Sequence, residues 1–165
     1  MATMTIGGST SKLHPQRAIT AGCLGAIATW LIGSAMSLFG LARAELMSVL
    51  GVQVLAVTFH TLDNAVAILG MLFNILFGGF VVGLIFGMVR QRFHGNLEWT
   101  GIIFGVACWL VAQIVVIPVL GFKFDPTPGF FSLGAGVWAP IGSLVAHVAY
   151  GVIVGEVYEP HEQLH

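Results

Sequence analysis

The chain has 165 residues and a formal net charge of −1 at pH 7, and it combines 57% apolar residues and 22 glycines with only 8% charged residues. A soluble globular domain carries roughly 25% charged residues, so this composition excludes a water-soluble fold and indicates an integral membrane protein. The basic residues form no cluster that would make a nucleic-acid-binding face, so nucleic acid is excluded as a partner.

Four windows of the sequence are long and apolar enough to cross a bilayer as helices, which takes about 20 residues each. They cover residues 18–40, 64–89, 100–120 and 137–158. We therefore predict an all-α integral membrane protein with a four-helix transmembrane bundle over residues 17–158. Residues 1–16 are predicted to form a flexible polar N-terminal tail, and residues 159–165 a C-terminal tail.

The basic residues also predict the orientation of the bundle. Four spans put both termini and the loop 90–99 on one side, with Lys12, Arg17, Arg90 and Arg92, and leave Arg43 and Lys123 on the other. Basic residues gather on the cytoplasmic side of membrane proteins, so both termini are expected in the cytoplasm. The two loops on the opposite side, 41–62 and 121–136, are long and apolar. They are expected to lie at the interface or to re-enter the membrane, and to invite a partner subunit.

Two parts of the chain resemble each other, which predicts a duplicated two-helix hairpin. When Trp30 is aligned with Trp109, residues 22–33 match residues 101–112 at Gly, Ala, Trp and Leu positions. Gly79 and Gly83 likewise align with Gly151 and Gly155. Each unit has two spans, so the copies point the same way and are expected to be parallel repeats about an axis along the membrane normal.

Glycines at a spacing of four residues predict helix contacts. Gly79, Gly83, Gly151 and Gly155 make small ridges on the second and fourth spans, which let backbones approach closely in lipid. The second and fourth spans are therefore expected to be the closest pair. Pro118 is expected to kink or end the third span, because it removes a backbone donor.

Polar side chains are rare in the spans, and a depth count predicts that they share one layer. This intramembrane polar layer comprises His147, Asn74, Gln113 and Ser34, with Tyr150 one turn from His147. Ionisable groups are costly in the membrane, so such a layer is either a functional site or a set of interhelical hydrogen bonds. His147 is the first candidate for contact with a ligand, proton or ion.

Other chemistry is weakly indicated. The last five residues, from His161 to His165, match the pattern HExxH of zinc proteases, but no cleft or third ligand follows. His161 and His165 are weak metal candidates, and a surface site would involve His14 or His94. His60 is at the wrong depth to share a haem with His147. Cys23 and Cys108 are interpreted as small core residues. No catalytic residue is identified and no cofactor is expected.

Three sequence patterns carry a resemblance to a known group of proteins. They are Gly-x-x-Gly-x-x-Ala-Thr at residues 22–29, the stretch 109–121 from Trp109 to Gly121, and the stretch 147–155 from His147 to Gly155. Together they resemble small bacterial four-helix inner-membrane proteins of unknown function, of the YagU-like type. The resemblance implies a multi-pass protein of the bacterial inner (plasma) membrane and supplies no activity.

Three functional interpretations follow. The first is a non-enzymatic accessory or scaffold subunit that packs against other subunits of a larger membrane complex, for example a respiratory one. The second is a small transporter or channel lined by His147, Asn74 and Gln113. The third is a redox subunit that contacts a quinone or haem through His147, with a ligand from a partner chain.

Overall fold

The computed structural model describes residues 13–39, 63–93, 95–121 and 128–158. The first long helix is α1 (Pro15–Leu38), and the second is α3 (Asp63–Leu76), which continues through the π-helical η1 (Phe77–Val82) into α4 (Gly83–Arg92). The third is α5 (Leu97–Val111), which continues through the π-helical η2 (Ala112–Val116) into α6 (Ile117–Gly121). A short 3-10 turn, η3 (Phe130–Ala135), precedes α7 (Trp138–Tyr158).

The prediction of an all-helical chain with four spans is confirmed. Four helices are long and apolar enough to cross a membrane, over Pro15–Met36, Ile68–Arg92, Leu97–Val119 and Trp138–Tyr158. Their sides carry many exposed large apolar residues, as the side of a bundle facing lipid tails does. The chain is therefore a multi-pass membrane protein.

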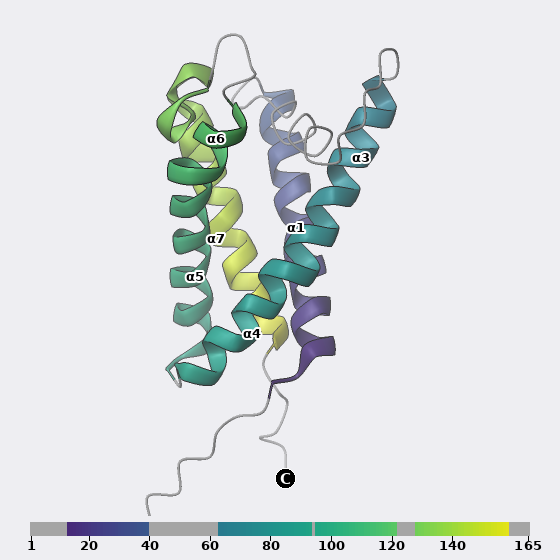
Figure 1. The fold of residues 1–165 in the computed structure, drawn as a ribbon, viewed down its shortest axis with the longest axis vertical. Coiled ribbons are helices and arrows are strands. Elements are labelled where there is room, and N and C mark those ends of the chain that lie inside the picture. The colour runs from purple at the N-terminus through teal and green to yellow at the C-terminus, as the bar shows by residue number, and fades with distance from the viewer. Residues whose placement is uncertain (1–12, 40–62, 94, 122–127, 159–165) are drawn as a thin grey trace, which may run out of the picture.

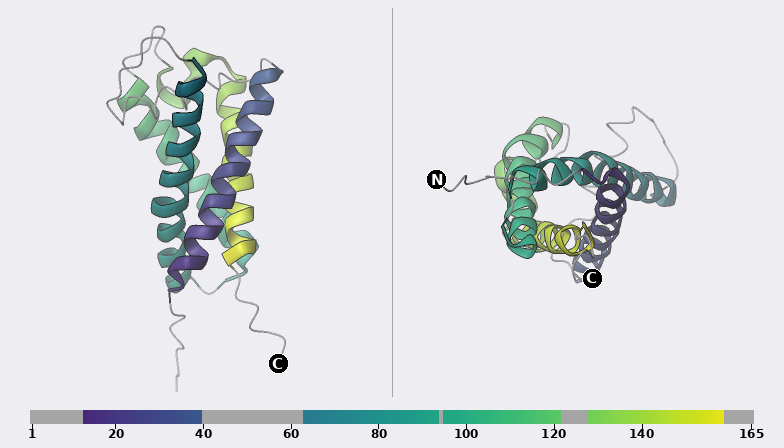
Figure 2. Two further views of the ribbon diagram at one scale, coloured as in Figure 1. Left: turned by 90° about the vertical axis from the view of Figure 1, so that its right-hand side faces the viewer. Right: turned by 90° about the horizontal axis from the view of Figure 1, so that it is seen from below.

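The four helices run the length of the molecule and surround a common centre when seen along the bundle (Figures 1 and 2). The N-terminal end of α1 and the C-terminal end of α7 lie at the same end, where the backbone N–H of His14 donates a hydrogen bond to the Tyr158 hydroxyl at 3.4 Å. The turn from α4 to α5 lies at this end as well (Figure 1). We call it the terminal end and its opposite the loop end.

Both π-helical segments have a local cause. The segment η1 contains the pair Gly78 and Gly79, and adjacent glycines are weak helix formers at which a helix readily changes register. The segment η2 ends just before Pro118, which has no N–H to donate to the carbonyl of Ile114. The predicted interruption near Pro118 is therefore a π-helical register change that leads into α6.

Glycines let α1 contact the second span backbone to backbone. A Cβ atom added at Gly22 would lie 2.6 Å from the carbonyl oxygen of Gly79 and 2.9 Å from the Cα of Gly83. A Cβ at Gly83 would in turn overlap the carbonyl oxygen of Ala18 and lie 3.2 Å from the Cα of Gly22. Only glycine fits at these positions, because the opposing atoms are backbone and cannot move aside.

The same arrangement joins α5 to α7. A Cβ added at Gly155 would lie 2.8 Å from the carbonyl oxygen of Leu97 and 3.5 Å from the Cα of Gly101. Gly101 and Gly151 face each other so closely that a Cβ on either would overlap the carbonyl oxygen of the other. These two helices make the most extensive contact between any two elements of the described chain.

The expected pairing of the second and fourth spans is therefore wrong. Their glycines do lie at helix contacts, but Gly79 and Gly83 face α1, whereas Gly151 and Gly155 face α5. The fourth span contacts α1 along its length and meets α4 at few positions. A spacing of small residues identifies a face that can approach another backbone closely, and it does not specify which helix comes to that face.

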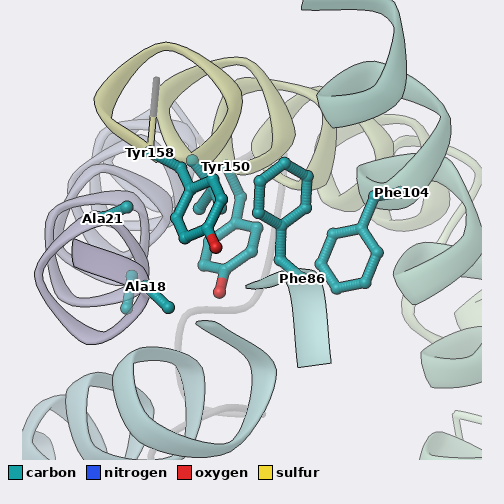
Figure 3. Close-up of a cluster of buried hydrophobic side chains, with 8 residues drawn as sticks. Ala18, Ala21, Phe86, Phe104, Tyr150 and Tyr158 are labelled. Carbon is teal, nitrogen blue, oxygen red and sulfur yellow. The ribbon is translucent and has the colours of Figure 1, made fainter. Parts of the chain in front are cut away.

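The two spans meet instead through large side chains at the terminal end (Figure 3). The ring of Phe86 is fully buried and packs edge-on against Tyr158 and Phe104, with ring centroids 5.7 and 5.2 Å apart. Ala18 and Ala21 of α1 complete this cluster. The core of the bundle is thus aromatic at the terminal end.

The contact of α1 with α7 differs from that of α5 with α4. A Cβ added at Gly25 of α1 would lie 2.7 Å from Cδ2 of Tyr150, so α7 approaches α1 closely. When Trp30 is aligned with Trp109, Gly25 falls at the position of Phe104 in α5. The Phe104 ring lies between α5 and Phe86 of α4 and holds these helices apart (Figure 3).

Candidate functional site

Two polar side chains in the middle of the bundle bind backbone carbonyls of neighbouring helices. The Tyr150 hydroxyl of α7 donates a hydrogen bond to the carbonyl oxygen of Gly78 in η1 at 2.7 Å, and this contact is buried. The Asn74 Nδ2 of α3 donates to the carbonyl oxygen of Ala26 in α1 at 2.8 Å. Because Gly78 also lies against Ala26, these bonds connect α1, η1 and α7 in one place.

His147 bonds within its own helix. Its Nδ1 lies 2.8 Å from the carbonyl oxygen of Ser143. A carbonyl oxygen can only accept, so Nδ1 carries the proton and Nε2 has the free lone pair. The backbone carbonyl of His147 meanwhile packs directly against Gly105 of α5.

Gln113 lies near the loop end, in η2. Its side chain is fully buried, and its Oε1 accepts a hydrogen bond of 2.8 Å from the hydroxyl of Ser132, which is 2% exposed. Within the described residues its Nε2 has no hydrogen-bond partner. An unpaired buried donor costs roughly 1–3 kcal/mol, so this amide requires an explanation.

The partner of Gln113 belongs to an unusual backbone segment. Phe131 and Ser132 in η3 both have φ of 55°, in the left-handed region. Each such residue costs roughly 1–2 kcal/mol unless it is glycine. Two contacts hold the segment in place. Ser132 donates its hydrogen bond to Gln113, and the ring centroid of Phe131 lies 5.7 Å from that of Trp109. The Trp109 indole N–H donates to the carbonyl oxygen of Pro140 in α7 at 3.2 Å.

The predicted polar residues do not form one layer. Gly105 is level with His147, and Gln113 follows Gly105 by eight residues, or about 12 Å of helix toward the loop end. No hydrogen bond given by the structure joins any two of the five predicted residues. Asn74 and Tyr150 donate to carbonyls that lie close together, those of Ala26 in α1 and Gly78 in η1. Gln113 belongs to a separate site, and Ser34 is half-buried on α1.

Two residues of this site were not predicted from the sequence. Ser132 was missed because it lies outside the spans, in a loop interpreted only as apolar. Ser143 was missed because its contribution is a backbone carbonyl, which every residue has. A signal for Ser132 exists in its position after Pro128 and Gly129, where a turn returns the chain to the end of the third span.

Several candidates stay as predictions. His60, His94, His161 and His165, like the loop 41–62 and residues 122–127, lie outside the described residues. Within the described ranges, no three His, Cys, Asp or Glu side chains are grouped so that they could hold a metal ion. Cys23 and Cys108 are free thiols.

These features define the class of protein: a small multi-pass membrane protein whose four spans are joined by glycine contacts and by hydrogen bonds to backbone carbonyls. A family model matches residues 14–164, and the chain belongs to that family, DUF6789, which is described as a family of unknown function. Neither the comparison with curated proteins nor the comparison with solved structures found a match.

Proposed function

We propose that the protein is a non-enzymatic accessory or scaffold subunit of a larger membrane complex. The observation that carries this proposal is the use of the mid-membrane polar groups. Tyr150 and Asn74 each donate to a backbone carbonyl of another helix, and His147 bonds within α7. Such bonds fix helix positions at about 0.6 kcal/mol each, and they leave little polar surface to line a path through the bundle.

The proposed setting is the bacterial inner membrane with the terminal end in the cytoplasm. Arg17 lies near the start of α1, and Arg90 and Arg92 lie in the last turn of α4, so all three are at the terminal end. This distribution supports the orientation expected from the positive-inside rule. The relation to the YagU-like proteins is part of the same proposal and depends on the sequence patterns alone.

We also infer that the bundle is a duplicated hairpin. The glycine contacts support this, because Gly83 meets Ala18 and Gly22 just as Gly155 meets the aligned residues Leu97 and Gly101. Contacts between aligned residues give a second argument. The aligned pair Gly78 and Tyr150 is hydrogen-bonded, and the aligned pair Phe86 and Tyr158 stacks edge to face. Two equivalent residues can touch only near a twofold axis, so these pairs support a pseudo-twofold axis between the second and fourth spans.

The scaffold proposal predicts partner chains. Native mass spectrometry of the protein, extracted in mild detergent from its own membranes, is expected to give a complex with larger membrane subunits. The spectrum after collisional removal of detergent identifies the partner masses. A bare monomer or homodimer under conditions that keep a known complex of the same membrane intact would contradict the proposal.

A second candidate function, proton-coupled transport, is favoured by one observation: the Nε2 of His147 has a free lone pair that can take up a proton. The scaffold proposal predicts that His147→Ala lowers the melting temperature by about 2 °C, through loss of one hydrogen bond, and leaves proton flux into reconstituted vesicles unchanged. Ser143→Ala keeps the carbonyl acceptor and serves as the control. Abolition of a wild-type proton flux by His147→Ala, with folding intact, would support transport instead.

A further inference from the structure

We propose that Gln113 and Ser132 form a binding site at the loop end for the carbonyl oxygen of an amphiphile from the surrounding bilayer. This inference is independent of the scaffold function. Its starting point is the Gln113 amide, which is fully buried and has its oxygen paired with Ser132 while its nitrogen lacks a partner within the described residues. The ligand would supply the acceptor that Nε2 lacks.

The chemistry of Nε2 determines the class of ligand. A primary amide nitrogen only donates, so its partner is an acceptor such as a carbonyl oxygen. The helix around it faces lipid, because Ile114, Val115 and Val116 are all exposed apolar residues. Water is scarce at this depth in a bilayer, and the molecules that reach it are apolar bodies with a polar group at one end.

The depth of Gln113 fits a carbonyl near the membrane surface. Gln113 precedes the end of α6 at Gly121 by eight residues, or about 12 Å of helix. The continuous helix from Leu97 to Gly121 has 25 residues and is longer than a hydrocarbon core of about 30 Å, so its end extends past the core. Gln113 therefore lies less than about 12 Å below the lipid ester groups. The carbonyl of a lipid ester and that of a quinone ring are the two sources at this level.

The segment η3, which is bonded to the Gln113 amide through Ser132, can change its conformation. Gln113 is fully buried and bonded to Ser132 of η3, a segment with two consecutive non-glycine residues in the left-handed region. Such backbone is kept in place by its surroundings, here by the Ser132 hydroxyl on Gln113. A ligand that binds Nε2 therefore lies beside the Ser132–Gln113 hydrogen bond, which holds η3 in place.

The test compares melting temperatures in three nanodisc bilayers. They are dioleoyl phosphatidylcholine, its diether analogue, which lacks ester carbonyls, and the diether analogue with added decylubiquinone. The proteins are the wild type, Gln113→Met, which keeps the length of the side chain without polar atoms, and Asn74→Leu as the control. Asn74 has its acceptor inside the protein, at Ala26, so Asn74→Leu should lower the melting temperature equally in all three bilayers.

Gln113→Met also loses the hydrogen bond from Ser132 in every bilayer, so we expect the melting temperature of the wild type relative to Gln113→Met to be about 2–4 °C higher where the relevant carbonyl is present than in the diether bilayer alone. A larger difference in the ester bilayer identifies the lipid ester, and one restored by decylubiquinone identifies the quinone. An equal difference in all three bilayers would overturn the proposal, because the acceptor would then be internal or water. So would the absence of any wild-type advantage. If Gln113→Met does not fold, the wild type is compared with Asn74→Leu, and its melting temperature relative to that control must be lower in the diether bilayer than in the bilayer that supplies the carbonyl.

Discussion

Replacing Gly151 with alanine is expected to destabilise the bundle more than any other single-methyl change. The new Cβ would overlap the carbonyl oxygen of Gly101 and lie 3.1 Å from the Cα of Gly105, and both obstacles are backbone. The helices α5 and α7 must then separate along their whole contact. Overpacking of this kind costs typically 1–3 kcal/mol and occasionally more, and the rigid contact puts this site at the upper end. The melting temperature in detergent should fall by about 6–12 °C.

Gly33→Ala is the matched control, because it makes the same chemical change at a position of α1 where a Cβ would meet nothing within 4 Å. Alanine is the better helix former by up to about 1 kcal/mol, so this variant should be unchanged or slightly stabilised. If the two variants melted within a degree or two of each other, the close backbone contact of α5 and α7 would be refuted.

Phe86→Ala is expected to have a comparably large effect through the opposite cause, an empty space. The ring is fully buried and touches Tyr158 and Phe104, so its removal leaves a cavity that joins three helices at the terminal end. Large-to-small changes of phenylalanine in well-packed cores cost about 3–5 kcal/mol. Thermal unfolding should accordingly shift down by roughly 10 °C.

Phe80→Ala, six residues earlier in the same span, provides the comparison. The Phe80 side chain is 48% exposed and faces outward, where lipid replaces the lost contacts. Its melting temperature should change by less than a quarter of the shift at Phe86. Equal effects at the two positions would mean that the aromatic cluster contributes nothing beyond the loss of apolar volume.

The spans were predictable because a membrane-crossing helix has a fixed minimum length and a uniform apolar composition. The glycine faces were predictable for a similar reason, since small residues at a spacing of four share one face. The helix that each glycine face contacts was not predictable. Gly83 and Gly155 carry no side chain that could recognise α1 or α5, and the shape of the whole bundle decides which helix they meet.

The side chains of the candidate site were predictable from the sequence, but the backbone carbonyls that they bind were not. Asn74, Gln113 and Tyr150 stand out as polar groups in apolar helices. Their partners include the carbonyls of Ala26 and Gly78, and nothing in the sequence distinguishes one backbone carbonyl from another. The depth count also failed for Gln113, because it measured from the helix ends and assumed that all four helices end at one level.

The difference between Gly25 and Phe104 has a mechanical consequence. The contact of α1 with α7 is close and continuous, whereas α5 and α4 touch mainly through an aromatic ring. Elements with few contacts rearrange at the lowest free-energy cost. A thinner or thicker bilayer must be accommodated by helix tilt. The second and third spans are therefore the neighbouring helices that can change tilt relative to each other, with the contact of Phe86 and Phe104 as the pivot, because close contacts join α1 to the second span, α1 to α7, and α5 to α7.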